Sequence, residues 1–256
     1  MRRRLAALLL VVALAALAGC SAFGSGEPDP EALAENATYE WDSSVNASYN
    51  VSKNEYQAVL AVENRSHQEV WRRDELGNDE PVEISALKFR YPNGTVVNST
   101  AMNVTRSRSR TNVSLPAEEG SVAFTAARAR GKRFSVPLLT EGSHNVTLPS
   151  GARVGIPLLS QVRPGGAERS VDDATNRMTV HWDEARRGPV LTRYYLERDL
   201  LIFGGMFALL VVAAVGGTVY YLRQIRVLER RREEVGLDVE TEDDDVDDSG
   251  PPPGMR

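Results

Sequence analysis

The stretch ISALKFRYPNGTVV, residues 84–97, has the pattern of a β-hairpin. Its first eight residues form a β-prone run, Pro92-Asn93-Gly94 supplies a turn, and Thr95-Val96-Val97 resumes an extended segment. Turn residues of this kind between two such runs are a strong short-range signal for paired antiparallel strands. The hairpin therefore predicts antiparallel β-structure for the central part of the chain.

Similar short runs lie on both sides of this hairpin, and Gly, Pro and Asn separate them at short intervals. The expected strands are 56–62, 113–115, 122–124, 134–136, 146–148, 154–159, 178–182 and 190–195. Short strands at this spacing are typical of an antiparallel β-sandwich. We predict a mainly β fold over residues 38–199, either as one sandwich or as two small ones that meet near residues 116–120.

The N-terminus has the plan of a secretory signal peptide. Three arginines at positions 2–4 precede an apolar stretch, residues 5–17, that is too short to span a membrane comfortably. The sequence Leu17-Ala18-Gly19-Cys20 resembles the lipobox of prokaryotic lipoproteins, in which the cysteine becomes the first mature residue and carries a lipid on its sulfur. We predict a signal peptide over 1–19 and lipidation of Cys20. The alternative is a plain signal peptide with a chance cysteine, and both the Sec and the Tat export routes stay open.

A tether and a short helix are expected over residues 20–37. Residues 21–26 are rich in Gly and Ser, which is typical of a flexible linker. Asp29-Pro30-Glu31 then has the order of an N-cap, a proline in the first turn and an acidic first turn. The chain has a single cysteine, which excludes a disulfide framework or a cysteine-based metal cluster built from this chain alone.

Residues 200–222 form an uncharged apolar run. At 1.5 Å per residue this run covers about 34 Å, which is enough to cross a bilayer core as a helix. The arginines that follow it are Arg223, Arg226, Arg230, Arg231 and Arg232. By the positive-inside rule the C-terminus is cytoplasmic and the preceding domain is extracellular, which places the protein in the cell membrane.

The segment after the span divides into two parts. A basic juxtamembrane helix is expected over 223–236, with its arginines at the level of the lipid head groups. Residues 237–256 are acidic and end in a proline run, so we expect them to form a disordered tail. The tail either docks a cytoplasmic partner or is merely solvated.

N-glycosylation sequons are the strongest statistical signal in the chain. Nine of its twelve asparagines begin an Asn-x-Ser/Thr sequence. They are Asn36, Asn46, Asn50, Asn64, Asn93, Asn98, Asn103, Asn112 and Asn145. This excess predicts a glycosylated, exported surface. Because residues i and i+2 share one face of a strand, Asn and Ser/Thr would face solvent while the Ala or Val between them faces the core.

A partner in the membrane is a possible reason for the region without sequons. Residues 148–199 contain none, so they are open to contact with the bilayer or with a membrane protein. A segment poor in asparagine also lacks sequons trivially, and this reading stays open. Small residues at Gly204/Ala208 and Ala213/Gly217 could let the apolar helix pack closely against another helix.

Catalytic and metal-binding motifs are not evident. The three histidines, His67, His144 and His181, are far apart and lack partners at metal-ligand spacing. His181 and Asp183 would share a strand face, where a surface pair is the default reading. No nucleotide-binding or hydrolase signature is present. We expect no enzyme activity, no catalytic residue, no metal and no cofactor.

Two cationic clusters could bind an anionic surface polymer. Arg106, Arg108 and Arg110 alternate and would line one face of a strand, and a second cluster comprises Arg128, Arg130, Lys132 and Arg133. Exposed basic residues without a ligand are the default reading. Nucleic acid is not expected as a partner, because the clusters lack interleaved aromatic residues.

The whole chain resembles an uncharacterised family of haloarchaeal membrane lipoproteins, known as a domain of unknown function. The resemblance rests on ISALKFRYPNGT (84–95), QVRPGG (161–166), RYYLERDL (193–200), YYLRQIR (220–226) and the acidic end. It implies no known activity. It does imply a high-salt habitat, which suits the 27 arginines against 3 lysines and the net charge of −5.

These features lead to a ranked set of functions. The first is a non-enzymatic surface lipoprotein whose β-domain serves envelope structure or presents a binding surface. The alternative is a sensor or an accessory subunit of a membrane complex, which would signal through the span to the acidic tail. A hydrolase or a metal-dependent enzyme is the third.

Overall fold

The computed structural model describes residues 28–236. The predicted signal peptide, Cys20 and the acidic tail over 237–256 lie outside the described residues. The described residues form two units, a β-domain that ends at Leu200 and the helical segment that follows it. A mainly β fold with antiparallel sheets and one C-terminal helix was predicted, and the structure confirms it.

The largest sheet has eight strands in the order β14-β15-β11-β1-β2-β9-β5-β6. Their bounds are β1 Ala47–Val51, β2 Glu55–Val62, β5 Ile84–Arg90, β6 Val96–Asn98, β9 Gly120–Ala127, β11 Gly142–Thr147, β14 Glu168–Asp172 and β15 Arg177–Ala185. All neighbours are antiparallel except β1 and β11, which are parallel. Strands from before and after residues 116–120 therefore share one sheet.

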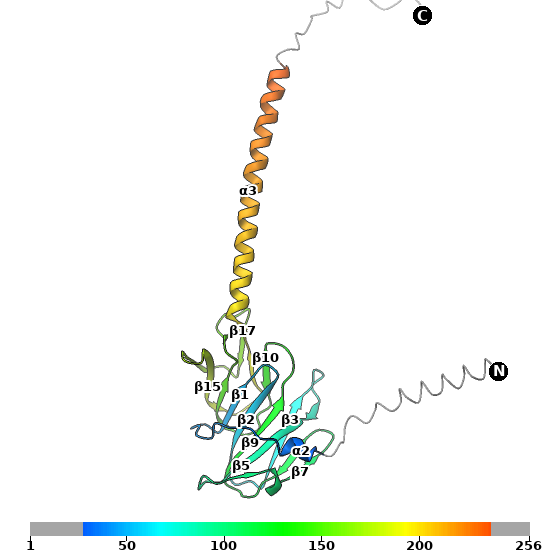
Figure 1. Ribbon diagram of the computed structural model, residues 1–256, viewed down its shortest axis with the longest axis vertical. Helices are drawn as coiled ribbons and strands as arrows, with labels where there is room; N and C mark the ends of the chain where they lie inside the picture. The colour runs from blue at the N-terminus through cyan, green and yellow to red at the C-terminus, as the bar shows by residue number, and fades with distance from the viewer. Residues whose placement is uncertain (1–27, 237–256) are drawn as a thin grey trace, which may run out of the picture. The chain divides into compact units, whose positions relative to one another are not determined.

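Three smaller sheets complete the domain. A four-stranded sheet has the order β4-β3-β8-β7, a three-stranded sheet has the order β10-β16-β13, and β12 pairs with β17. Their bounds are β3 His67–Arg73, β4 Asp79–Pro81, β7 Asn103–Arg106, β8 Thr111–Ser114, β10 Arg133–Val136, β12 Ala152–Arg153, β13 Gln161–Arg163, β16 Val190–Arg193 and β17 Tyr195–Leu196. A 3-10 turn, η1 Ser99–Ala101, precedes β7. In Figure 1, β10 and β17 lie at the end of the domain where α3 begins, and α2, β5 and β7 lie at the other end.

One core holds these sheets together. Tyr49, Leu60 and Phe124 on the large sheet are completely buried, and so are Val70 and Val113 on the four-stranded sheet. All five belong to a single cluster of buried apolar side chains. Burial of each such side chain contributes roughly 1.5–3 kcal/mol before the loss of chain entropy is counted.

The segment before β1 covers part of the other face of the large sheet. Tyr39 packs there with Val59 and Ala123 in a second, smaller cluster. Its hydroxyl donates to the Ala86 carbonyl at 2.7 Å and lies 3.0 Å from Thr125 Oγ1. Burial raises the pKa of Tyr39 to about 12. Ala86 has a φ of 50° where the β5–β9 register shifts, so the tyrosine pins an irregular point of the strand.

The two helices agree with the sequence pattern. Helix α2 (Pro30–Leu33) begins after Asp29, whose side chain accepts a hydrogen bond from the Glu31 amide as an N-cap. Helix α3 (Glu197–Gly236) has 40 residues. Within the described residues it is the one helix long and apolar enough to cross a membrane.

Two local predictions are wrong. Residues 154–159 do not form a strand, because the Leu159 and Ser160 amides both donate to the Ile156 carbonyl in a turn. Arg106, Arg108 and Arg110 do not line one strand, because β7 ends at Arg106 and a turn over 107–110 leads into β8. The Ser107 side chain holds that turn by accepting from the Arg110 amide at 3.0 Å.

Candidate functional site

The sequon asparagines occupy two kinds of position. Asn36, Asn64, Asn93, Asn98 and Asn103 are exposed, and Asn46, Asn50, Asn112 and Asn145 are half-buried. For the half-buried four the predicted alternation is confirmed, because the residue after each one is completely buried: Ala47, Val51, Val113 and Val146. Nothing in the structure tests whether these sites carry glycans, so glycosylation stays a prediction.

Three of the half-buried asparagines make separate polar contacts on the outer face of the large sheet. Arg177 Nη2 donates to Asn50 Oδ1 at 2.6 Å, and the Ser143 amide donates to Asn46 Oδ1 at 3.0 Å. His181 Nδ1 lies 2.7 Å from Asn145 Oδ1. In each case the contact uses the amide oxygen, whereas a glycan would be attached to the amide nitrogen.

The histidines do not converge on one site. His144 and His181 lie on the neighbouring strands β11 and β15, but His144 is paired with Trp182 and points into the core. Its Nδ1 lies 2.9 Å from the Gly142 carbonyl oxygen, and burial lowers its pKa. His181 is on the outer face with its Nε2 3.1 Å from Asp183 Oδ1, and His67 is exposed on β3. Over residues 28–236, no group of three His, Cys, Asp or Glu side chains could hold a metal ion.

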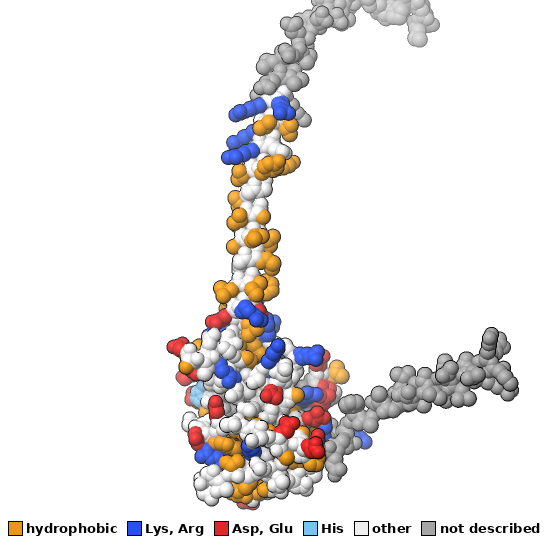
Figure 2. Space-filling model, viewed as in Figure 1, with side chains coloured by type: hydrophobic (Ala, Val, Ile, Leu, Met, Phe, Trp, Pro, Cys, Tyr) orange, Lys and Arg blue, Asp and Glu red, His pale blue; other side chains and the backbone are white. Residues whose placement is uncertain are grey.

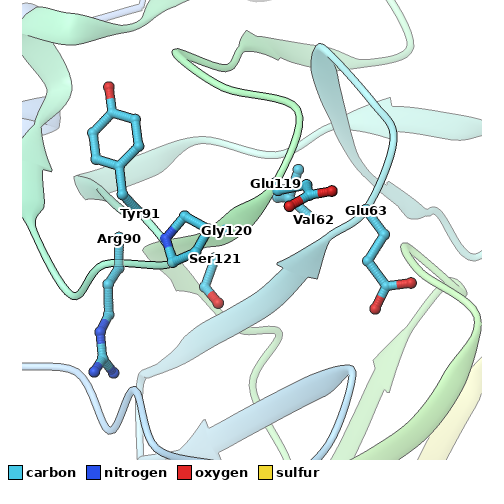
Figure 3. A pocket seen from close by; sticks show the side chains of 8 residues that line it. Val62, Glu63, Arg90, Tyr91, Glu119, Gly120 and Ser121 are labelled. Carbon is cyan, nitrogen blue, oxygen red and sulfur yellow. The ribbon is translucent and has the colours of Figure 1, made fainter.

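One hollow lies at the ends of three neighbouring inner strands of the large sheet, β2, β9 and β5 (Figure 3). It has a volume of about 360 Å³ and is lined by Val62, Glu63, Arg90, Tyr91, Pro92, Glu119, Gly120 and Ser121. Glu63 and Glu119 are exposed. Arg90 donates to Asp42 at 2.7 Å, so its charge is already matched. Two exposed carboxylates and a paired arginine do not make a binding site.

A larger groove of about 690 Å³ lies between the β3–β4 hairpin and the segment that contains β10. Its wall includes Tyr56, Trp71 and Phe134 together with Arg130 and Arg133. Sequence reasoning missed this groove, because hairpin and segment are far apart in the chain. The basic residues of the second predicted cluster are thus brought beside aromatic ones.

Two of the three arginines in the first cationic cluster are paired within the domain. Arg106 pairs with Glu83, and Arg110 pairs with both Glu69 and Asp79. The Arg110 guanidinium also lies 5.0 Å from the centre of the Trp71 ring. These arginines have structural partners, which leaves Arg108 as the exposed member without an ion pair among the described residues.

The second cationic cluster keeps most of its charge. Lys132 pairs with Asp199, but Arg128, Arg130 and Arg133 make no ion pair within residues 28–236. Arg128 instead donates to the Tyr194 hydroxyl at 2.7 Å, with its guanidinium 5.7 Å from the centre of that ring. Its Nε is buried without a hydrogen-bond partner. Of the two predicted clusters, this one is the candidate anion site.

The arginines that follow the apolar run are exposed on α3. Arg223, Arg226, Arg230 and Arg231 have exposed side chains, and Arg232 lies in the helix with a side chain that the structure does not describe. Figure 2 shows a basic stretch of the helix beyond its apolar part. This is the order that a membrane span with a basic flank requires.

Residues 43–240 match the Family of unknown function (DUF5803). The chain belongs to this family. The match begins just before β1 and includes the whole of α3, so the DUF5803 unit combines the β-domain with the apolar helix. No curated protein matches the chain.

Proposed function

We propose that this DUF5803 protein is a non-enzymatic cell-surface lipoprotein, whose β-domain is held at the membrane by α3 and by a lipid on Cys20. One observation carries the proposal. Residues 200–222 of α3 are uncharged, and every side chain among them is exposed. A helix that is apolar on all sides is stable when it is buried in a protein or in a membrane.

The direction of insertion follows from the charges at the two ends of the run. Before it, Glu197-Arg198-Asp199 has no positive excess, and after it the exposed arginines of α3 begin at Arg223. The positive-inside rule then places the β-domain outside the cell and the C-terminus in the cytoplasm. The sequons and the signal-peptide pattern agree with this orientation.

The absence of catalysis is part of the proposal. Support comes from the roles that the titratable groups already have. His144 is enclosed in the core, and His181 is held between Asn145 and Asp183 on a polar sheet face. The half-buried Arg177 ties the ends of β1 and β11 together through Asn50, Val51 and Leu148. Such contacts serve the fold.

A fractionation experiment with two lesions tests the anchoring. Cys20→Ser removes the thiol on which the lipid is made, and Leu209→Arg with Val212→Arg places two charges in the centre of the span. Each lesion alone should leave the protein in the membrane pellet, and both together should release it. The matched control is Leu228→Arg, which lies beyond the uncharged run. Wild-type protein without the lipid mass would contradict the role of Cys20, and recovery of the double lesion in the pellet would contradict the anchoring.

Labelling with a membrane-impermeant maleimide tests the orientation. In the Cys20→Ser background, Ser170→Cys on β14 should react in intact cells, whereas Ser249→Cys beyond α3 should react after lysis. The opposite labelling pattern would show that the β-domain lies in the cytoplasm, and it would contradict the proposed role at the cell surface.

A further inference from the structure

The β10–β16–β13 sheet presents an arginine face at the end of the domain where α3 begins. Arg133 on β10 is directly opposite Arg193 on β16, which is opposite Gln161 on β13. Directly opposite residues share one face of a sheet, and so do residues i and i+2 of a strand. Arg133, Ser135, Leu191, Arg193, Gln161 and Arg163 therefore form this face, which contains no carboxylate.

The charges of this face are not matched by neighbours. Arg133, Arg163 and Arg193 make no ion pair among the described residues, and neither does Arg130 in the turn before β10. Like charges that are directly opposite in a ladder destabilise it. Other arginines of the domain do have partners, for example Arg72 with Glu80 and Arg106 with Glu83. The face is thus a place where an anion would relieve repulsion.

A residue next to one end of the arginine face is in contact with the residue that immediately precedes the apolar run. Lys132, next to Arg133, pairs with Asp199, and the Tyr194 amide donates to the Lys132 carbonyl at 2.9 Å. Asp199 immediately precedes the uncharged residues 200–222. Figure 2 shows basic side chains gathered at this end of the β-domain. If residues 200–222 span a membrane, the Lys132–Asp199 ion pair brings the start of β10 close to the point where the chain enters it.

Two further features suit a lipid surface. Strands β10, β13 and β16 contain no sequon, so no predicted glycan would stand between this face and the bilayer. The adjoining groove is lined by the half-buried Trp71 as well as by Arg130 and Arg133, and it also contains the carboxylates of Asp74 and Glu75. Tryptophan with arginine is the combination favoured at the membrane–water interface.

We propose that Arg130, Arg133, Arg163 and Arg193, the membrane-proximal arginine cluster, bind the phosphate groups of acidic lipids in the leaflet that the β-domain faces. This inference rests on the proposed membrane anchoring and adds a lipid preference to it. Arginine suits the role because its planar fork binds phosphate oxygens through two hydrogen bonds. The contact would hold the β-domain down on the bilayer surface.

The test uses the full chain in lipid nanodiscs, with Cys20→Ser and a spin label on Ser135→Cys in the arginine face. One set of discs contains phosphatidylcholine alone, and the other contains phosphatidylcholine and phosphatidylglycerol in equal amounts. We expect the label to be severalfold less accessible to a water-soluble nickel chelate in the acidic discs. Arg133→Gln with Arg193→Gln should abolish that difference. The matched control is Arg72→Gln with Arg106→Gln, which removes two paired arginines and should keep it.

Each other outcome has a definite meaning. Equal accessibility in both kinds of disc, or protection that survives the double substitution in a folded protein, would overturn the proposal. Protection in neutral discs after addition of inorganic phosphate would assign the cluster to a soluble anion and would also overturn it. Failure of the chain to enter any disc would instead contradict the membrane anchoring, and so the two proposals fail in distinguishable ways. Thermal unfolding of each variant shows whether it is folded.

Discussion

Arg133 and Arg193 are directly opposite partners in the β10–β16 ladder, and neither makes an ion pair among the described residues. Their neighbours along the strands, Phe134 and Thr192, are buried, so the ladder itself is held by the core. Two guanidinium groups at opposite positions of neighbouring strands repel each other wherever solvent and salt do not screen them. We therefore expect the arrangement to lower the stability of the free domain.

Removal of one of these charges should stabilise the protein. Arg193→Gln is expected to raise the free energy of unfolding of the full chain in neutral detergent by about 0.5 kcal/mol. The gain should be larger at about 0.1 M salt, where the Debye length is about 10 Å, than near 1 M, where the Debye length is about 3 Å. Denaturant unfolding at several salt concentrations measures it.

The control for this effect is Arg106→Gln, which removes an arginine that is paired with Glu83. It should leave stability unchanged or lower it slightly, because the carboxylate then loses its partner. A loss of stability in Arg193→Gln at low salt would mean that repulsion between the two arginines is not significant.

A backbone position in the fold is predicted to tolerate glycine alone. Gly120 begins β9 with a φ of +144°, and a Cβ atom there would lie 2.5 Å from the Arg90 carbonyl oxygen and 2.6 Å from Phe89 Cζ. Phe89 is completely buried, so the ring has little room to move. Gly120→Ala is expected to cost about 2–4 kcal/mol in the free energy of unfolding.

Gly94, in the turn between β5 and β6, is the matched comparison. Its φ is +87°, but a Cβ atom there would meet nothing within 4 Å. Gly94→Ala should therefore cost only the backbone strain, about 1 kcal/mol. Equal losses in the two variants, measured by thermal unfolding, would mean that the contact with Phe89 and Arg90 is not what makes Gly120 necessary.

The strands could be predicted from sequence because alternation reports burial directly. The predicted run 56–62 corresponds to β2, and the predicted runs 84–91 and 95–97 correspond to β5 and β6. The same local signal failed at Arg106, Arg108 and Arg110. There the Ser107 hydroxyl accepts a hydrogen bond from the Arg110 amide and so stabilises a turn in place of a strand. It also failed at 154–159, where a turn follows Ile156.

The candidate site could be predicted only in part. The basic residues at 128–133 are visible in the sequence, and so is the uncharged run after Asp199. Their proximity is not, because it depends on pairing between β10 and β16, whose partners are about sixty positions apart in the chain. Likewise, the difference between paired Arg110 and unpaired Arg133 arises from Glu69 and Asp79 on other strands.

Alkaline pH should weaken the domain through its buried tyrosines. The pKa of Tyr39 is raised from 10.0 to about 12 by burial, so the folded state holds the phenolic proton more tightly than the unfolded state. This stabilisation is complete below pH 10 and is lost as the pH rises from 10 toward about 12. Burial also raises the pKa values of Tyr49 and Tyr56, which act in the same direction.

Tyr39→Phe should reduce that alkaline loss and also lower stability at neutral pH. The neutral-pH cost is expected to be about 1–2 kcal/mol, because the hydrogen bonds to the Ala86 carbonyl and Thr125 are removed. Thr125→Val is the control: it removes one partner but keeps the buried phenol, so its alkaline loss should persist. Denaturant unfolding across this pH range separates the two variants. If the free energy of unfolding of Tyr39→Phe falls with pH as steeply as that of the wild type, the alkaline loss does not come from Tyr39.

Glycan occupancy should follow the exposure of the sequon asparagines. The five exposed sites are Asn36, Asn64, Asn93, Asn98 and Asn103. Asn112 differs from them, because its Oδ1 is buried without a partner on β8, and a glycan on the adjacent nitrogen would need to displace packed neighbours. Mass spectrometry of glycopeptides from native membranes should find the exposed sites modified and Asn112 bare.

Two substitutions test this difference. Asn112→Gln should leave the total glycan mass of the protein unchanged, whereas Asn93→Gln should reduce it by one glycan chain. Modification of Asn112 to the same extent as Asn93 would contradict the dependence on exposure.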